Sequence, residues 1–302
     1  MELRSEEGTQ QGDPLGPFYF CLGIHPLLER VAAAHPDCIV IAYMDDVHIL
    51  GPPESAHAAF GMLSQELGTV GLVVTPGKCQ AYSPAAMDQV QSLFPQEMWR
   101  PQGVEAIDST TLGIFAEGHL VLGTPVGSDA FVGRVVADSL SVVEAHITAA
   151  FECLVSTEML PESDQQCYFA LLRCCVHPRL THLLRALPPR LISPFAARFD
   201  SLIIGGLDRL VHGSLHVPGF EWSVRMAQLP LRLGGVGLTP MHLLSPCAWL
   251  GSLAATWSRV CAIGDFDHLE LGKHQSSRVS QFVQDTAAAV YMLRCTHSST
   301  LA

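Results

Sequence analysis

Charged residues are scarce in this chain of 302 residues: they make up 15% of it, against 48% hydrophobic residues. Disordered chains need the opposite balance, so the composition predicts a packed core. No apolar run approaches the roughly 20 residues that cross a bilayer. The first residues include Glu2, Arg4, Glu6 and Glu7, which is not a secretory signal. We therefore expect a soluble intracellular protein without a membrane segment. The sequence does not assign it to the nucleus or the cytoplasm.

Lysine is almost missing: of the 17 Lys and Arg residues, only Lys78 and Lys273 are lysines. The excess of acidic residues is concentrated in residues 1–127, which hold 15 acids and 4 bases, a net charge of −11. Residues 128–302 hold 14 acids and 13 bases, a net charge of −1. An acidic surface repels phosphates, so we expect only weak, unspecific nucleic-acid binding.

Cysteines are numerous, but no spacing among the ten suggests a disulfide framework. Without a secretory signal, we interpret them as reduced thiols in an apolar core. One cluster, made of Cys167, Cys174, Cys175, His177 and His182, raises the possibility of a zinc site. Its spacing fits no standard finger, and a helix would scatter the side chains over several faces.

The stretch from Cys38 to Gly51 holds two apolar runs on either side of adjacent acids, Asp45 and Asp46. The apolar, partly β-branched runs predict a strand, a tight turn and a second strand. Two like charges at the turn repel each other, and a divalent cation would remove that cost. A solvated turn is the alternative, since Asp is common in turns for local reasons.

The other patterns predict secondary structure along the rest of the chain. A loop rich in Gly and Pro at 8–17 leads into a helix that stops near His35. Asp200 falls in an apolar helical run, where we expect it on the helix surface. The Gly-rich run at 229–238 predicts a turn between helical layers, because no Walker lysine or strand–GxGxxG–helix context accompanies it. The further expectations are a helix from 53 to about 68–71, a strand at 72–74, a short helix at 84–94, β structure at 103–127, and helices at 128–155, 163–187, 193–213, 241–260 and 276–294.

Four of these segments together resemble the palm of a reverse transcriptase of the non-LTR retrotransposon type. Residues 8–17 resemble motif B, and Ala42-Tyr43-Met44-Asp45-Asp46 resembles motif C, the Tyr-x-Asp-Asp turn. Residues 71–79, which include Lys78, resemble motif D, and residues 122–127 resemble the entry to the primer grip and thumb. The four occur in the family's order. The run at 229–238 is also similar to the region downstream of such polymerases.

The resemblance implies an α+β fold: a partial polymerase palm, with helices packed on an antiparallel sheet, followed by an all-α thumb-like region. We place the two domains at residues 1–127 and 128–302. The family's activity is RNA-directed DNA synthesis, in which Mg²⁺ ions activate the primer 3′-hydroxyl and stabilise the leaving triphosphate. By this resemblance Asp45 and Asp46 are the metal ligands, and Lys78 acts on the departing pyrophosphate as a charge or a proton donor.

The same resemblance assigns binding roles and partners. The partners of the intact family are an RNA template and a DNA primer. An uncovered sheet edge in the palm would expose apolar surface, so we also expect self-association. The residues expected to bind nucleotide or template are Gln11, Gly12, Pro14 and Tyr43, and those expected in a primer-grip-like turn are Leu122 and Gly123.

A third metal carboxylate is expected in motif A, ahead of motif B, and the seven residues before Gly8 leave no room for it. The sequence therefore predicts a reverse transcriptase fragment truncated before motif A, which is inactive as an isolated chain. The sequence leaves open whether Met1 is the true start. The alternative is a palm–thumb remnant that serves without catalysis as a scaffold or a protein-interaction module.

Overall fold

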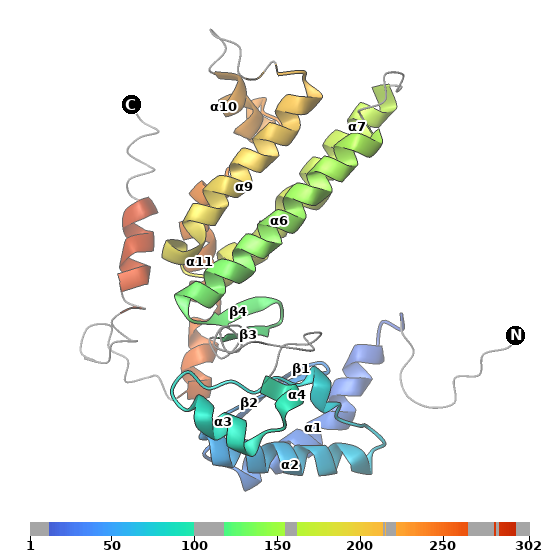
Figure 1. The fold of residues 1–302 in the computed structure, drawn as a ribbon, viewed down its shortest axis with the longest axis vertical. Helices are drawn as coiled ribbons and strands as arrows, with labels where there is room; N and C mark the ends of the chain where they lie inside the picture. Colours follow the sequence, from blue (N-terminus) through green and yellow to red (C-terminus); the bar gives the residue numbers. More distant parts are fainter. Residues whose placement is uncertain are drawn as a thin grey trace, which may run out of the picture. The chain divides into compact units, whose positions relative to one another are not determined.

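The computed structural model describes residues 12–99, 118–154, 162–213, 215, 222–264, 281 and 284–293. Backbone contacts divide the chain into two compact units, residues 1–131 and 132–302. Small antiparallel sheets occur in the first unit, and helices dominate the second (Figure 1). The predicted α+β fold class is therefore confirmed. No helix in the described ranges is long and apolar enough to cross a membrane.

The first unit is built around a two-stranded hairpin that packs on two helices. Strands β1 and β2 pair antiparallel, with Tyr43 opposite Asp46 and Ile39 opposite Leu50. A short hairpin of this kind needs a packed face to be stable. The element bounds in this unit are α1 Gly16–Ala34, β1 Ile39–Tyr43, β2 Asp46–Leu50, α2 Pro53–Thr69, η1 Pro76–Lys78, α3 Met87–Leu93, α4 Gln96–Trp99, β3 Gly118–Val121 and β4 Thr124–Gly127.

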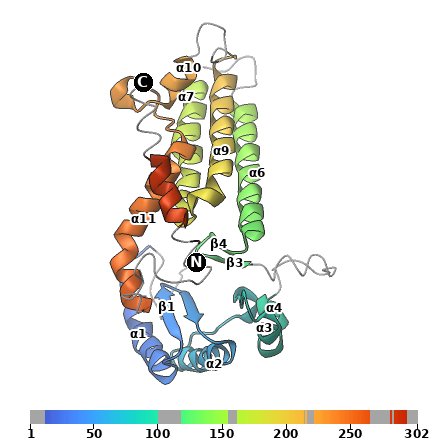
Figure 2. The same cartoon turned by 90° about the vertical axis from the view of Figure 1, so that its left-hand side faces the viewer.

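Alternation along the strands decides which side of the hairpin packs. Val40, Val47 and Ile49 turn to one face, where they contact a small core made by α1 and α2. Figure 2 shows the hairpin beside these two helices. The fully buried residues of that core are Val31, Cys38, Ala59 and Leu63. The opposite face stays open: Ile39, Ile41, Tyr43 and Leu50 are 36–63% exposed. That face is only partly covered, at His48, which pairs with Ile41 across the hairpin and has a buried Nε2.

The predicted strand at 72–74 is wrong. These residues have no regular secondary structure, and Val73 is 88% exposed. Three β-favouring residues make a strand only when a neighbouring strand supplies ladder hydrogen bonds, and none of the described strands pairs with this segment. Gly71 follows the C-terminal end of α2 and adopts a left-handed conformation, with φ +79°.

The second unit is a set of long helices around one extended apolar core. Helices α6, α7 and α9 run side by side (Figure 2), and their apolar faces meet at residues such as Leu140, Tyr168 and Phe199, each at most 1% exposed. Described residues 281 and 284–293 are also helical. The bounds are α6 Asp129–Leu154, α7 Glu162–Leu171, a π turn Leu172–Val176, a 3₁₀ turn His177–Leu180, α8 Thr181–Ala186, α9 Pro189–Leu210, α10 Trp222–Gln228, η5 Leu231–Leu233 and α11 Met241–Gly264.

The helices expected at 128–155, 193–213 and 241–260 are confirmed, with small shifts at their ends. The one expected at 163–187 changes type three times: a π turn begins at Leu172, Pro178 then falls in a 3₁₀ turn, and α8 follows from Thr181. Proline has no N–H to continue an α-helical ladder. The run at 229–238 is a compact turn, in which a Cβ on Gly235 would lie 2.1 Å from the carbonyl oxygen of Leu229.

Asp200 corrects another expectation, because it is buried rather than on the helix surface. It is 8% exposed, and its side chain on α9 lies against the first residues of α11. Its carboxylate accepts hydrogen bonds from the backbone N–H groups of Met241 (2.7 Å) and His242 (3.0 Å), and it contacts His242 Nδ1 at 2.6 Å. An acid from α9 thereby caps α11, since the first N–H groups of a helix have no partner within it.

Candidate active site

The carboxylate pair lies at the tip of the β1–β2 hairpin. Met44 and Asp45 form the turn, and Asp46 is the first residue of β2. Met44 adopts φ +58°, the left-handed conformation that a two-residue hairpin turn requires. The Sγ of Cys21 on α1 lies 3.8 Å from the Sδ of Met44, which joins the helix to the turn. The strand–turn–strand expected here is confirmed.

Both carboxylates face solvent, and neither has a cationic partner among the described residues. Asp45 and Asp46 are exposed, and neither forms an ion pair with any side chain in the described part of the chain. Two adjacent, uncompensated carboxylates are hard oxygen donors, which suits a divalent cation such as Mg²⁺. The described ranges contain no group of three or more His, Cys, Asp or Glu that could hold a metal. The pair is thus at most part of a metal site.

The loop ahead of α1 carries the motif B residues, and only some of them are described. Gln11 lies outside the described residues. Gly12 has φ +97°, which favours glycine, and Pro14 is exposed in the turn that follows. The Oδ1 of Asp13 accepts the N–H of Leu15 at 2.9 Å, so the turn leads directly into the helix. This loop and the hairpin tip are connected through α1.

Lys78 is the last residue of the 3₁₀ turn at 76–78, and its side chain is exposed. Its backbone N–H donates to the carbonyl of Thr75 at 2.9 Å, which fixes the turn. No hydrogen bond or ion pair within the described residues joins Lys78 to Asp45 or Asp46. The structure therefore places the lysine on its own loop and leaves its predicted role untested.

The primer-grip-like turn connects β3 to β4. Leu122 and Gly123 have φ +49° and +77°, two left-handed residues in succession, as in a type I′ hairpin. Leu122 is 48% exposed, so an apolar side chain stands at the tip. Gly118 begins β3, where a Cβ would lie 2.3 Å from the ring of Phe131. Of the β structure expected at 103–127, the part before 118 lies outside the described residues.

Side chains that the sequence patterns did not indicate connect the loop of Lys78 to strand β3. Gln80 lies two residues beyond Lys78, and its side-chain oxygen accepts a hydrogen bond from the N–H of Leu120 at 3.3 Å. The Tyr82 and His119 rings lie 5.2 Å apart. Burial lowers the pKa of His119, and the positive charge that His48 on β2 can carry lowers it further. The only available signal was one histidine on each strand, which is too common to be informative.

Comparison with known proteins fits this arrangement. Residues 1–109 match the family described as reverse transcriptase (RNA-dependent DNA polymerase). A 76-residue segment is 30% identical to the retrotransposable element SLACS 132 kDa protein of Trypanosoma brucei gambiense. The N-terminal part of this chain is a reverse transcriptase segment of the non-LTR retrotransposon type.

This reverse transcriptase segment represents a small part of its relative. The matched segment covers 25% of this chain and 6% of the SLACS protein, so the activity and partners of that whole protein are not established for this chain. No solved structure matches the chain. The family assignment covers the hairpin with Asp45 and Asp46 and the loop with Lys78. It stops before the β3–β4 hairpin and the helical unit.

Proposed function

We propose that the first unit contributes part of a polymerase active site, in which Asp45 and Asp46 bind Mg²⁺ for RNA-directed DNA synthesis. The observation that carries this proposal is the exposed carboxylate pair at the tip of a β-hairpin, without a cationic partner among the described residues. Asp is common in turns, but two adjacent acids repel each other, and no described cation compensates that repulsion. Within a reverse transcriptase segment, this pair is where the family binds metal.

Nucleotidyl transfer with two metal ions requires more oxygen ligands than two side chains supply. We therefore propose that a further carboxylate comes from outside the described residues of this chain. Divalent ions at the site would lower the pKa of a primer 3′-hydroxyl and neutralise charge on the triphosphate. Asp45 is the more direct ligand in this proposal, because it lies in the turn itself. The 302-residue chain alone is expected to be inactive.

The remaining site residues would orient the substrates. Gln11, Gly12 and Pro14 would line the nucleotide and template side, in front of α1. Tyr43 would lie beside them, since its side chain is 63% exposed on the open face of the hairpin. Lys78 is proposed to place its ammonium where negative charge builds on pyrophosphate, because lysine can also donate a proton there.

The β3–β4 hairpin is proposed to support the primer. Its tip residues, Leu122 and Gly123, present an apolar side chain and an accessible backbone. The link from Gln80 to Leu120 would keep this tip near the loop of Lys78. RNA template and DNA primer are thus the proposed partners of the complete enzyme, and the acidic chain alone should hold them weakly.

The open face of the β1–β2 hairpin supports a further proposal, self-association of the isolated chain. Ile39, Ile41 and Tyr43 form an apolar row on β1, whose outer edge pairs with no described strand. Such edges accept strands from other chains. A second copy could therefore pair along β1, and a change to charged residues there should abolish that association.

Primer extension tests the polymerase proposal. The purified chain is given an RNA template annealed to a DNA primer, four deoxynucleotides and Mg²⁺, first alone and then with an added upstream segment that supplies fingers and the third carboxylate. We expect extension only with the added segment, and its loss in the Asp45→Asn and Asp46→Asn double variant. Extension by the chain alone would overturn the prediction of inactivity. No activity in either form would favour the non-catalytic scaffold.

Metal binding can be measured without any activity. Titration with Mn²⁺ as a paramagnetic probe should broaden the NMR signals of residues around Asp45 and Asp46. The double variant should lose this effect, whereas the matched change Asp88→Asn, on helix α3, should keep it. Equal broadening in the double variant would mean that the carboxylate pair does not bind the ion.

A further inference from the structure

Helix α1 and the residue before it carry an apolar stripe that no described part of the chain covers. Leu15, Phe18, Tyr19 and Leu22 are each 53–59% exposed. Their spacing of i, i+3, i+4 and i+7 places them on one side of the first two turns, while Ile24, Leu27 and Val31 bury the other side farther along. Four large apolar side chains together are more than scattered surface residues, and such a row is typical of an interaction surface.

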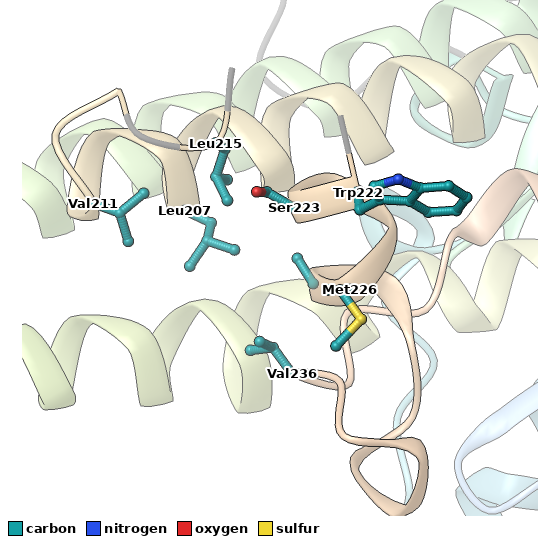
Figure 3. A pocket seen from close by; sticks show the side chains of 8 residues that line it. Leu207, Val211, Leu215, Trp222, Ser223, Met226 and Val236 are labelled. Atoms are coloured by element: carbon teal, nitrogen blue, oxygen red, sulfur yellow. The ribbon is translucent and has the colours of Figure 1, made fainter. Parts of the chain in front are cut away.

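The second unit contains an apolar pocket with a volume of about 480 Å³. Figure 3 shows Leu207, Met226 and Val236 around a common space, with the Trp222 ring at one side. Of its eight lining side chains only Ser223 is polar. The volume lies within the roughly 300–1,000 Å³ of typical binding pockets. Trp222 and Met226 are 67% and 45% exposed, so part of this apolar lining is accessible from outside.

The charges at the two surfaces are opposite. Arg225 lies over the Trp222 ring, 5.1 Å from its centre, and pairs with no carboxylate in the described part of the chain. Asp13 is exposed, two residues before Leu15, in a unit with a strong excess of acids. Trp, Arg and Met are residues enriched at the centres of protein interfaces. A helix with an acid beside its apolar row complements this pocket in polarity and charge.

We propose that the first two turns of α1 in one copy of the chain dock into the Trp222 pocket of a second copy. The spacing of the α1 stripe is the one that helices use to anchor in apolar grooves. Asp13 would then approach Arg225, which stacks at the side of the pocket. The contact is heterologous, because two different surfaces of the same chain meet. It does not depend on the polymerase proposal and uses neither Asp45 nor the edge of β1.

A mixing experiment tests the contact with two variants of the full chain. The stripe variant, Phe18→Ser with Leu22→Ser, removes the row but keeps the pocket. The pocket variant, Met226→Glu, keeps the row but places a charge in the pocket. Sedimentation equilibrium of the unmodified chain should give species above the 32.6 kDa of one copy. Each variant alone should associate at least about thirty-fold more weakly, as expected when a central interface residue is lost.

The equimolar mixture of the two variants decides the result. One partner still has the stripe and the other still has the pocket, so the mixture should form a one-to-one complex at concentrations where each variant alone stays largely monomeric. A mixture that stays monomeric would overturn the proposal, and so would an unmodified chain that stays monomeric at high micromolar concentration. Circular dichroism melts of both variants check that they remain folded. The substituted side chains are at least 45% exposed, so their loss should not unfold the chain.

A charge swap tests the geometry independently. Arg225→Asp alone and Asp13→Arg alone should both weaken association, and a mixture of the two variants should regain part of it. Pairing along the edge of β1 would be unaffected by any of these changes. Association that persists in the stripe and pocket variants but is lost on Ile41→Lys would therefore reject this contact and support strand pairing instead.

Discussion

The two units of the chain differ in how they use apolar residues. The first has four fully buried residues in the core under its hairpin, and it exposes apolar side chains on α1, β1 and β3. The second has a continuous core along α6, α7 and α9, with residues such as Val136 and Phe199 completely buried. The candidate chemistry thus lies on the unit with the smaller core, because a site proposed to receive nucleic acid and further protein segments has to leave part of its surface uncovered.

The largest expected effect separates the two cores. Phe199→Ala removes a fully buried ring from the second unit and should cost about 3–5 kcal/mol, since the helices around it cannot close the cavity. Hydrogen exchange followed by mass spectrometry should show faster exchange in residues 132–302. The matched change Phe18→Ala on the exposed stripe should alter stability by less than about 0.5 kcal/mol. Equal effects of the two changes would contradict the assignment of the core.

The buried cap of α11 comes next. Asp200→Ala leaves the N–H groups of Met241 and His242 without their acceptor and should cost about 2–3 kcal/mol. Exchange should rise first at the start of α11. Asp138→Ala, an exposed acid on α6, is the control and should have little effect. If both changes behave alike in guanidinium unfolding, the Asp200 carboxylate does not stabilise the helix.

Substitutions in the small core of the first unit should cost less stability than substitutions in the core of the second unit. Leu63→Ala removes a 4% exposed side chain from α2, and we expect a loss of about 2 kcal/mol, the lower end for such changes, because few neighbours surround it. The loss should appear as faster exchange in residues 16–69 and leave residues 132–302 unaffected. A simultaneous effect in both units would mean that they unfold together.

The smallest effect concerns pH. The pKa of His119 is lowered by burial and by His48, so the unfolded chain takes up this proton more readily than the folded one. Stability of the first unit should therefore fall as pH drops below about 6.5 toward the folded pKa. The pKa of Glu66 is lowered by its hydrogen bond from Arg30, which adds a loss only at more acidic pH.

Melting curves between pH 7.5 and 5.5 check this prediction. His119→Gln should make the first unit's stability less dependent on pH, because the titrating group is gone. His25→Gln, whose histidine side chain is 64% exposed, should leave the dependence unchanged. An unchanged slope in His119→Gln would show that the imidazole is not responsible.

Local patterns were sufficient to predict much of this chain. The helices α1, α2, α6, α9 and α11 follow from apolar periodicity, and α1, α2 and α9 also have prolines at their starts. The β1–β2 hairpin follows from two apolar runs around a pair of acids, and the family assignment follows from motif order. These features depend on neighbours in the sequence, so the residues themselves carry the information.

Only the tertiary structure decided the rest. It showed that 72–74 pairs with none of the described strands, that Asp200 caps a helix 41 residues away, and that Gln80 and Tyr82 connect the loop of Lys78 to β3. It also showed which apolar residues stay exposed, on α1 and around the Trp222 pocket. The physical reason is the same in each case. A buried partner, a ladder hydrogen bond or a covered face depends on residues far apart in the chain, and no local pattern specifies which of them meet.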